Sequence, residues 1–168
     1  MTDREPCHEL VKRTGAPDAA CLERAAPHVA HDLYLLRHCW VDQGQRTGWT
    51  LWFITARALM DFFFVYERTN KGGRYSDDML AADFLPVGAW RAKAQEYSEA
   101  AQPPDYAACR RVANKLSAHL TYSRLALVSN GPSAAVHDYL MGIMGMWLDA
   151  LAPERRAWFN AWFPPHAA

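Results

Sequence analysis

The chain has 168 residues and no formal net charge, because 18 Lys and Arg side chains balance 18 Asp and Glu side chains. Hydrophobic residues make up 51% and charged residues 21%, which is typical of a globular domain and excludes a disordered or fibrous chain. This length suits one hydrophobic core, and the neutral charge excludes a general attraction to polyanions, so any contact with nucleic acid has to be local.

The first 27 residues mix charges with Pro6, Gly15, Pro17 and Pro27 and show little hydrophobic periodicity. Proline and glycine at this density interrupt regular structure. We therefore predict that residues 1–27 form a loosely ordered N-terminal arm, with one short helix near Cys21.

Apolar residues recur at helical spacing through most of the remaining sequence, and no segment alternates in the manner of a strand. The pattern predicts an all-α, single-domain helical bundle of four to six helices over residues 28–168. The most apolar segment, residues 49–68, is rich in aromatic side chains and is expected to be the central helix. The expected helices span residues 28–41, 49–68, 90–101, 105–129, 136–151 and 153–162.

Cys7, Cys21, Cys39 and Cys109 are widely spaced and form no C-x-x-C pair, which gives no support to a zinc ribbon or a thioredoxin-type site. Reduced thiols are the simpler expectation, since a Cys7 to Cys21 bridge requires an oxidising compartment. The start of the sequence lacks the apolar segment of a secretory signal. No stretch approaches about 20 apolar residues. We therefore expect a cytoplasmic protein that does not span a membrane.

The segment RRVANKLSAHLTYSR, residues 110–124, carries the sharpest chemical pattern. Arg111, Lys115 and His119 follow one another at intervals of four, so on a helix they line one strip, with Asn114 beside them. Histidine can move a proton near neutral pH, cations neutralise phosphate, and Asn can hold either partner in register. These groups suit metal-independent RNA cleavage, in which His119 acts as the acid or base and no cofactor is required.

The aromatic segment ARALMDFFF at 56–64, followed by NKLSAH at 114–119, resembles the HEPN (higher eukaryotes and prokaryotes nucleotide-binding) superfamily of helical bundles. Many members are dimeric ribonucleases of toxin or antiviral systems, and they carry an Arg four to six residues before the His. Here that position holds Ala113 or Asn114, so Arg111 is the substitute one turn earlier. The resemblance implies an RNA substrate, a homodimer and a cognate antitoxin or other protein partner.

Arg57 lies on the central predicted helix and is expected to pair with Asp61 or with an acidic loop residue, because an unpaired buried charge is costly. A functional interpretation places Arg57 and Asp83 in the same groove as His119, where they clamp the substrate and orient the imidazole. A purely structural interpretation makes the Arg57 pair an internal salt bridge.

Two alternatives remain open. In the first, the His119 strip is structural and the bundle is a non-catalytic protein-interaction or small-ligand-binding module. In the second, His28, His31 and His38 on one helix join His119 or His137 as metal ligands, as in helical bundles of the DinB type.

Overall fold

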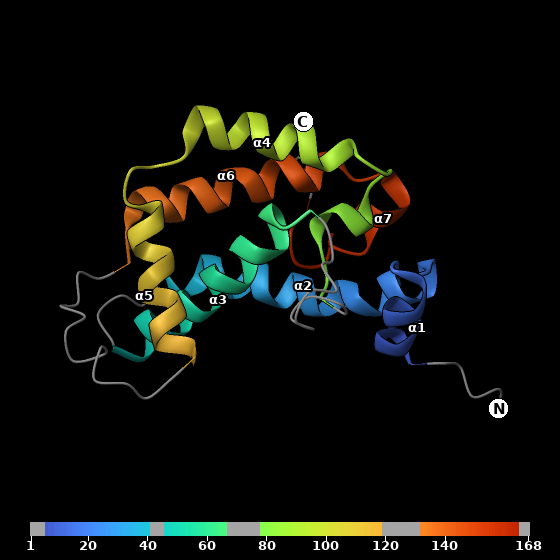
Figure 1. Cartoon of the computed structure of the whole chain (residues 1–168), viewed down its shortest axis with the longest axis horizontal. Helices are drawn as coiled ribbons and strands as arrows, with labels where there is room; N and C mark the ends of the chain where they lie inside the picture. The colour runs from blue at the N-terminus through green and yellow to red at the C-terminus, as the bar shows by residue number, and fades with distance from the viewer. Residues whose placement is uncertain (1–5, 41–45, 67–77, 119–131, 165–168) are drawn as a thin grey trace.

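The computed structural model describes residues 6–40, 46–66, 78–118 and 132–164, and these ranges contain helices and no strand (Figure 1). The predicted all-α, single-domain bundle is confirmed. Short helices bring the α-helices of the described part to seven, where the pattern predicts four to six. None of these helices combines the length and the apolar character needed to cross a bilayer. The elements are α1 (Cys7–Thr14), α2 (Ala19–Cys39), α3 (Arg46–Phe64), the 3-10 helix η1 (Ala81–Phe84), α4 (Ala89–Ala101), α5 (Tyr106–Ala118), α6 (Ala134–Ala150) and α7 (Pro153–Ala157).

The central position of α3 is confirmed. This helix packs against α2, α5, α6, α4 and η1. The fully buried side chains of α3 include Trp52, Met60 and Phe63. The apolar residues of α3 cover more of its surface than a single face, so neighbouring helices can bury it on several sides. Contact with this many neighbours makes α3 the scaffold on which the other helices are placed.

The other helices lie around α3 and extend to two opposite ends of the molecule (Figure 1). α4 lies alongside α6, and the Tyr97 hydroxyl donates a hydrogen bond of 3.0 Å to the carbonyl oxygen of Tyr139 between them. α5 lies at one end of the longest axis, whereas α1 lies at the other. Features of α5 and features of α1 therefore belong to distant parts of the surface.

Two buried tryptophans fix the helices relative to one another by hydrogen bonds as well as by packing. The indole Nε1 of Trp90 donates to the carbonyl oxygen of Phe63 at 2.8 Å, and that of Trp147 donates to Ala81 at 3.1 Å. A buried indole N–H without an acceptor costs about 1–3 kcal/mol, so these bonds favour one arrangement of the core.

The helices predicted to begin at residues 136 and 153 begin at Ala134 and Pro153. The Ser133 hydroxyl accepts a hydrogen bond from the amide of Val136 at 3.2 Å and caps α6, while Pro153 occupies the first turn of α7. The helix predicted to run to about residue 129 is described as far as Ala118, and its continuation lies outside the described residues.

The predicted N-terminal arm requires a correction within residues 6–27. These residues form α1 and the first turns of α2, so the boundary placed before residue 28 falls inside a continuous helix. Asp18 caps α2 by accepting a hydrogen bond of 2.7 Å from the amide of Cys21. Pro27 removes one backbone donor from the helix, but Leu22 and Ala26 are buried on its inner face and hold this segment in place.

The expectation of reduced thiols is wrong for one pair of cysteines. Cys7 and Cys21 form a disulfide whose Cα atoms lie 5.6 Å apart, and this bond joins α1 to α2. Cys39 and Cys109 are buried and are not part of a disulfide. Burial raises the pKa of the Cys109 thiol to about 12, which keeps it protonated and unreactive.

Candidate nucleic-acid interface

Two of the predicted site residues meet across the contact between α3 and α5. The Nε of Arg57 donates a hydrogen bond of 2.6 Å to Oδ1 of Asn114. The Arg57 side chain is half-buried, whereas Asn114 is exposed. The contact joins residues 57 positions apart in the sequence and holds a guanidinium group at the edge of the protein surface.

A second contact lies one turn away on both helices. The Nη2 of Arg110 lies 2.7 Å from Oδ1 of Asp61. On α3, Asp61 follows Arg57 by four residues, whereas on α5 their partners occur in the reverse order, Arg110 before Asn114. The two helices therefore run antiparallel here. The side chains of Arg110 and Asp61 are 42% and 20% exposed, so the ion pair contributes at most about 1 kcal/mol. Its main effect is to set the register of α5 on α3.

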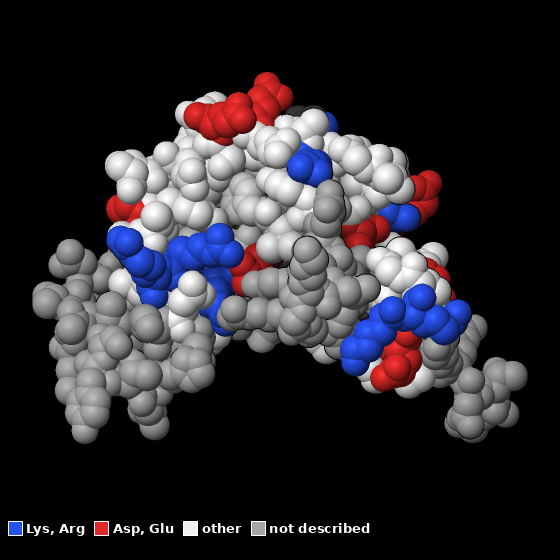
Figure 2. Space-filling model, viewed as in Figure 1, with Lys and Arg blue, Asp and Glu red and all other residues white. Residues whose placement is uncertain are grey.

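We call the surface formed by Arg57, Arg110, Arg111 and Asn114 the α3–α5 face. Figure 2 shows Lys and Arg side chains gathered over α5. Arg111 is exposed and follows Arg110 in the sequence. The α3–α5 face thus combines three guanidinium groups with one amide, and the Asp61 carboxylate lies beside them. This is a local positive region on a chain with no net charge.

A small cavity of about 200 Å³ bounds this face between α2 and α3. Asp32, Asp61 and Asp78 contribute carboxylates to its wall. Burial raises the pKa of Asp32, although His31 beside it lowers that pKa in part. Carboxylates repel phosphate, so a polyanion is favoured on the Arg111 side of the face and disfavoured over the cavity.

The two residues at the centre of the predicted catalytic strip are not described in full. His119 lies outside the described residues, and so does the side chain of Lys115, whose backbone is part of α5. The helix extends from Arg111 through Lys115 to Ala118, so positions 111 and 115 are one turn apart as predicted. The role of His119 stays a prediction.

Asp83 lies on η1, and its predicted role in orienting His119 stays a prediction because His119 lies outside the described residues. Its Oδ2 accepts a hydrogen bond of 2.9 Å from the amide of Leu80 at the start of η1. It also lines a pocket formed with α1 and α2. The carboxylate of Asp83 therefore caps its own turn, which limits the movement of this short side chain.

The metal alternative finds no support in the described part of the chain, where no group of three or more His, Cys, Asp or Glu side chains is arranged to hold an ion. His137, one expected ligand, is buried, and its Nδ1 accepts a hydrogen bond of 3.2 Å from Nε1 of Trp52. Its ring also stacks on Trp40 at a centroid distance of 4.4 Å. His38 packs against Tyr34 at 3.9 Å. These histidines serve packing.

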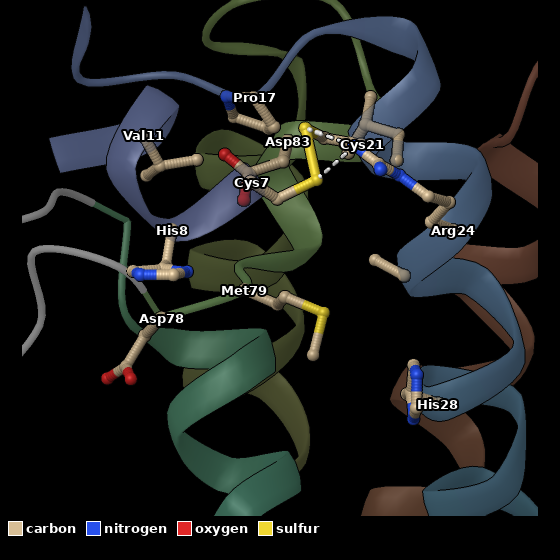
Figure 3. Close-up of a pocket in the computed structure, with 12 residues that line it drawn as sticks. Cys7, His8, Val11, Pro17, Cys21, Arg24, His28, Asp78, Met79 and Asp83 are labelled. Atoms are coloured by element: carbon tan, nitrogen blue, oxygen red, sulfur yellow. Dashed lines mark hydrogen bonds between the residues drawn. A yellow bond between two sulfur atoms is a disulfide. The ribbon is translucent and has the colours of Figure 1, made fainter. Parts of the chain in front are cut away.

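Sequence reasoning missed a larger pocket, which we call the α1–α2 pocket. Its volume is about 420 Å³, and Figure 3 shows the Cys7–Cys21 disulfide in its wall. The sequence feature that could have indicated this pocket is the position of Cys7 and Cys21, each of which lies at the start of a helical segment. The lining residues are Cys7, His8, Val11, Pro17, Cys21, Leu22, Arg24, Ala25, His28, Asp78, Met79 and Asp83.

No protein-family model matches this chain, and neither a curated protein nor a solved structure matches it. The likeness to the HEPN superfamily therefore rests on residues 56–64 and 114–119. Both segments contribute to the contact between α3 and α5, through Arg57 and Asn114.

Proposed function

We propose that the chain is a HEPN-like helical domain whose α3–α5 face binds the phosphate backbone of RNA. The observation that carries the proposal is the Arg57–Asn114 hydrogen bond beside the exposed Arg111. Guanidinium groups recognise phosphate through paired N–H donors, and they remain charged at every physiological pH. A preformed contact between helices reduces the entropy lost when the backbone of RNA binds.

The proposed reaction is cleavage of the RNA strand without a metal ion. His119 removes the proton of a 2′-hydroxyl, and the oxygen attacks the adjacent phosphorus. The bond from phosphorus to the 5′-oxygen of the next nucleotide breaks, and that oxygen takes a proton from water. The products are a cyclic phosphate and a free 5′-hydroxyl. Arg111 and Lys115 stabilise the charge that develops on the phosphoryl oxygens, and Asn114 keeps the substrate in register.

Binding is tested on the exposed cation of the face. In a fluorescence anisotropy titration with single-stranded RNA, Arg111→Ala should weaken binding and lower the slope of log affinity against log salt by roughly one. Arg37→Ala removes the same charge from an exposed position in the last turn of α2 and is the matched control. Equal weakening by both variants would mean that only the overall charge matters, and the proposal would fail.

Cleavage is tested in the presence of a metal chelator. The wild-type protein should release RNA fragments that end in a cyclic phosphate, and His119→Ala should lose this activity while its circular dichroism spectrum stays helical. Activity that survives His119→Ala contradicts the assigned reaction. Loss of cleavage with unchanged RNA affinity separates the chemical role of His119 from the binding role of the face.

The proposal includes the biological setting that the resemblance implies. The domain acts as a homodimer in a toxin or antiviral system, with a cognate antitoxin or other protein partner, and it works in the cytoplasm. Cytoplasmic glutathione and thioredoxin keep thiols reduced, so this location requires that the Cys7–Cys21 disulfide be open to reduction.

A second candidate function, a small-ligand-binding module without catalysis, is favoured by the α1–α2 pocket and its volume of about 420 Å³. This candidate predicts that wild-type protein neither binds nor cuts RNA. It also predicts that native mass spectrometry detects a small molecule that co-purifies with the protein and is lost in Ala25→Trp, since Ala25 lines the pocket.

A further inference from the structure

The Cys7–Cys21 disulfide lies where a small molecule can reach it. It forms part of the wall of the α1–α2 pocket (Figure 3). Cys7 is partly exposed, whereas Cys21 is buried with 4% of its surface exposed. A reagent that enters the pocket therefore meets the sulfur of Cys7 first.

The guanidinium group of Arg24, which is permanently charged, lies beside both sulfur atoms of the disulfide. Its Nη2 lies 2.8 Å from Sγ of Cys7 and 3.5 Å from Sγ of Cys21. Its Nε donates a hydrogen bond of 3.3 Å to the carbonyl oxygen of Ala20, which holds the side chain in this position. A disulfide sulfur is a weak acceptor, but a thiolate carries a full negative charge, so Arg24 stabilises the reduced pair more than the oxidised pair.

The helix positions of the cysteines act in the same direction. Cys7 is the first residue of α1, where Pro6 makes no side-chain cap hydrogen bond, and Cys21 lies in the first turn of α2. Helix N-termini favour negative charge, which makes a thiolate a better leaving group there. The Asp18 carboxylate caps α2 at Cys21 and opposes this effect, so Arg24 is the larger contribution at that sulfur.

We propose that Cys7–Cys21 is a redox-active disulfide that undergoes exchange with low-molecular-weight thiols in the α1–α2 pocket. The thiolate of the small molecule attacks Sγ of Cys7, a mixed disulfide forms, and Cys21 departs as a thiolate beside Arg24. A second small thiolate then attacks the small-molecule sulfur of the mixed disulfide and releases Cys7 as a thiolate. Two small thiols are oxidised to one small disulfide, and the protein disulfide is reduced to two thiols.

Reduction has a structural consequence that goes beyond the proposed RNA binding. Val11 is the buried residue of α1, so few apolar contacts hold this helix and the disulfide supplies the covalent link to α2. Exchange therefore releases α1 and opens one wall of the α1–α2 pocket. The α3–α5 face lies at the opposite end of the longest axis, so this device acts apart from it (Figure 1).

The test measures reduction of the native full chain by reduced glutathione, followed by alkylation and mass spectrometry. Arg24→Gln removes the charge at similar size and should slow reduction by about tenfold, while Arg24→Lys restores much of the rate because it keeps the charge. Arg37→Ala on the same helix is the matched control and should react at the wild-type rate. Circular dichroism of each variant verifies that it is folded.

Two results would overturn the proposal. The first is that wild type and Arg24→Gln react equally fast, or that wild type reacts only at its rate of global unfolding, which is the behaviour of a structural bridge. The second concerns the mixed disulfide trapped by rapid acid quenching, which tandem mass spectrometry should locate on Cys7. Glutathione on Cys21 contradicts the assigned direction of attack.

Discussion

The contact between α4 and α6 depends on the absence of a side chain at Gly142, and a matched pair of substitutions tests it. A Cβ atom added at Gly142 overlaps the hydroxyl of Tyr97, whereas one added at Gly145 meets nothing within 4 Å. Both glycines lie inside α6, where replacement by Ala gains about 1 kcal/mol of helix propensity. The two substitutions therefore differ only in the neighbour that they meet.

The expected magnitudes follow from that neighbour. Gly142→Ala displaces the Tyr97 hydroxyl from the carbonyl oxygen of Tyr139, a hydrogen bond worth about 1 kcal/mol, and costs about 1 kcal/mol more because the end of the Tyr97 side chain has to move. After the propensity gain of about 1 kcal/mol, the net loss is about 1 kcal/mol, or roughly 2–4 °C in Tm for a chain of this size. Gly145→Ala should raise Tm by about 2–4 °C.

Differential scanning calorimetry measures both shifts. The double variant Gly142→Ala with Tyr97→Phe lacks the overlapping hydroxyl and should melt above Gly142→Ala alone. Equal increases in Tm for Gly142→Ala and Gly145→Ala would refute the described packing of α4 on α6.

Two further predictions concern the buried histidine and the α3–α5 face. Burial lowers the pKa of His137 from 6.5, so the unfolded chain binds the proton first. The free energy of unfolding should fall by at most about 1.4 kcal/mol per pH unit as the pH drops below 6.5. In urea unfolding, His137→Gln should lack this pH-dependent component. Identical pH profiles for the wild type and the variant would contradict the prediction. Arg57→Ala and Asn114→Ala should each weaken RNA binding a few-fold. Because the two side chains form a hydrogen bond, a double-mutant cycle should show that their effects are not additive. Full additivity would contradict a shared role in binding.

Much of the fold follows from local patterns that the sequence displays. The apolar residues of α3 repeat at helical spacing over several turns, and Ser133 and Pro153 mark helix starts by their own chemistry. The N-terminal region differs from the prediction because Pro17 and Pro27 indicate interruptions in a local pattern, whereas the structure has α1 and α2 there. Proline is tolerated in α2 because tertiary packing of its buried face outweighs the lost hydrogen bond, and packing is not visible in a local pattern.

The candidate site was predictable in its residue types but not in its partners. The sequence indicates that Arg57 needs a partner and predicts Asp61 or an acidic loop residue in that role. It does not predict the hydrogen bond of Arg57 to Asn114. The Arg57–Asn114 and Arg110–Asp61 pairs depend on the antiparallel register of α5 on α3. For the cysteines, the sequence allows a Cys7 to Cys21 bridge but favours reduced thiols because of the expected compartment. Only the packing of α1 onto α2 shows that the two residues are close enough to form the bond.

The most direct test of the proposed function is the location of bound RNA on the protein surface. RNA that contains 4-thiouridine is photocrosslinked to the native protein, and the attached peptides are identified by mass spectrometry. RNA bound at the α3–α5 face should form crosslinks to peptides of α3 and α5. Crosslinks confined to α1 and the start of α2, where Figure 2 shows a second group of basic side chains at the far end of the molecule, would contradict it, as would the absence of crosslinks.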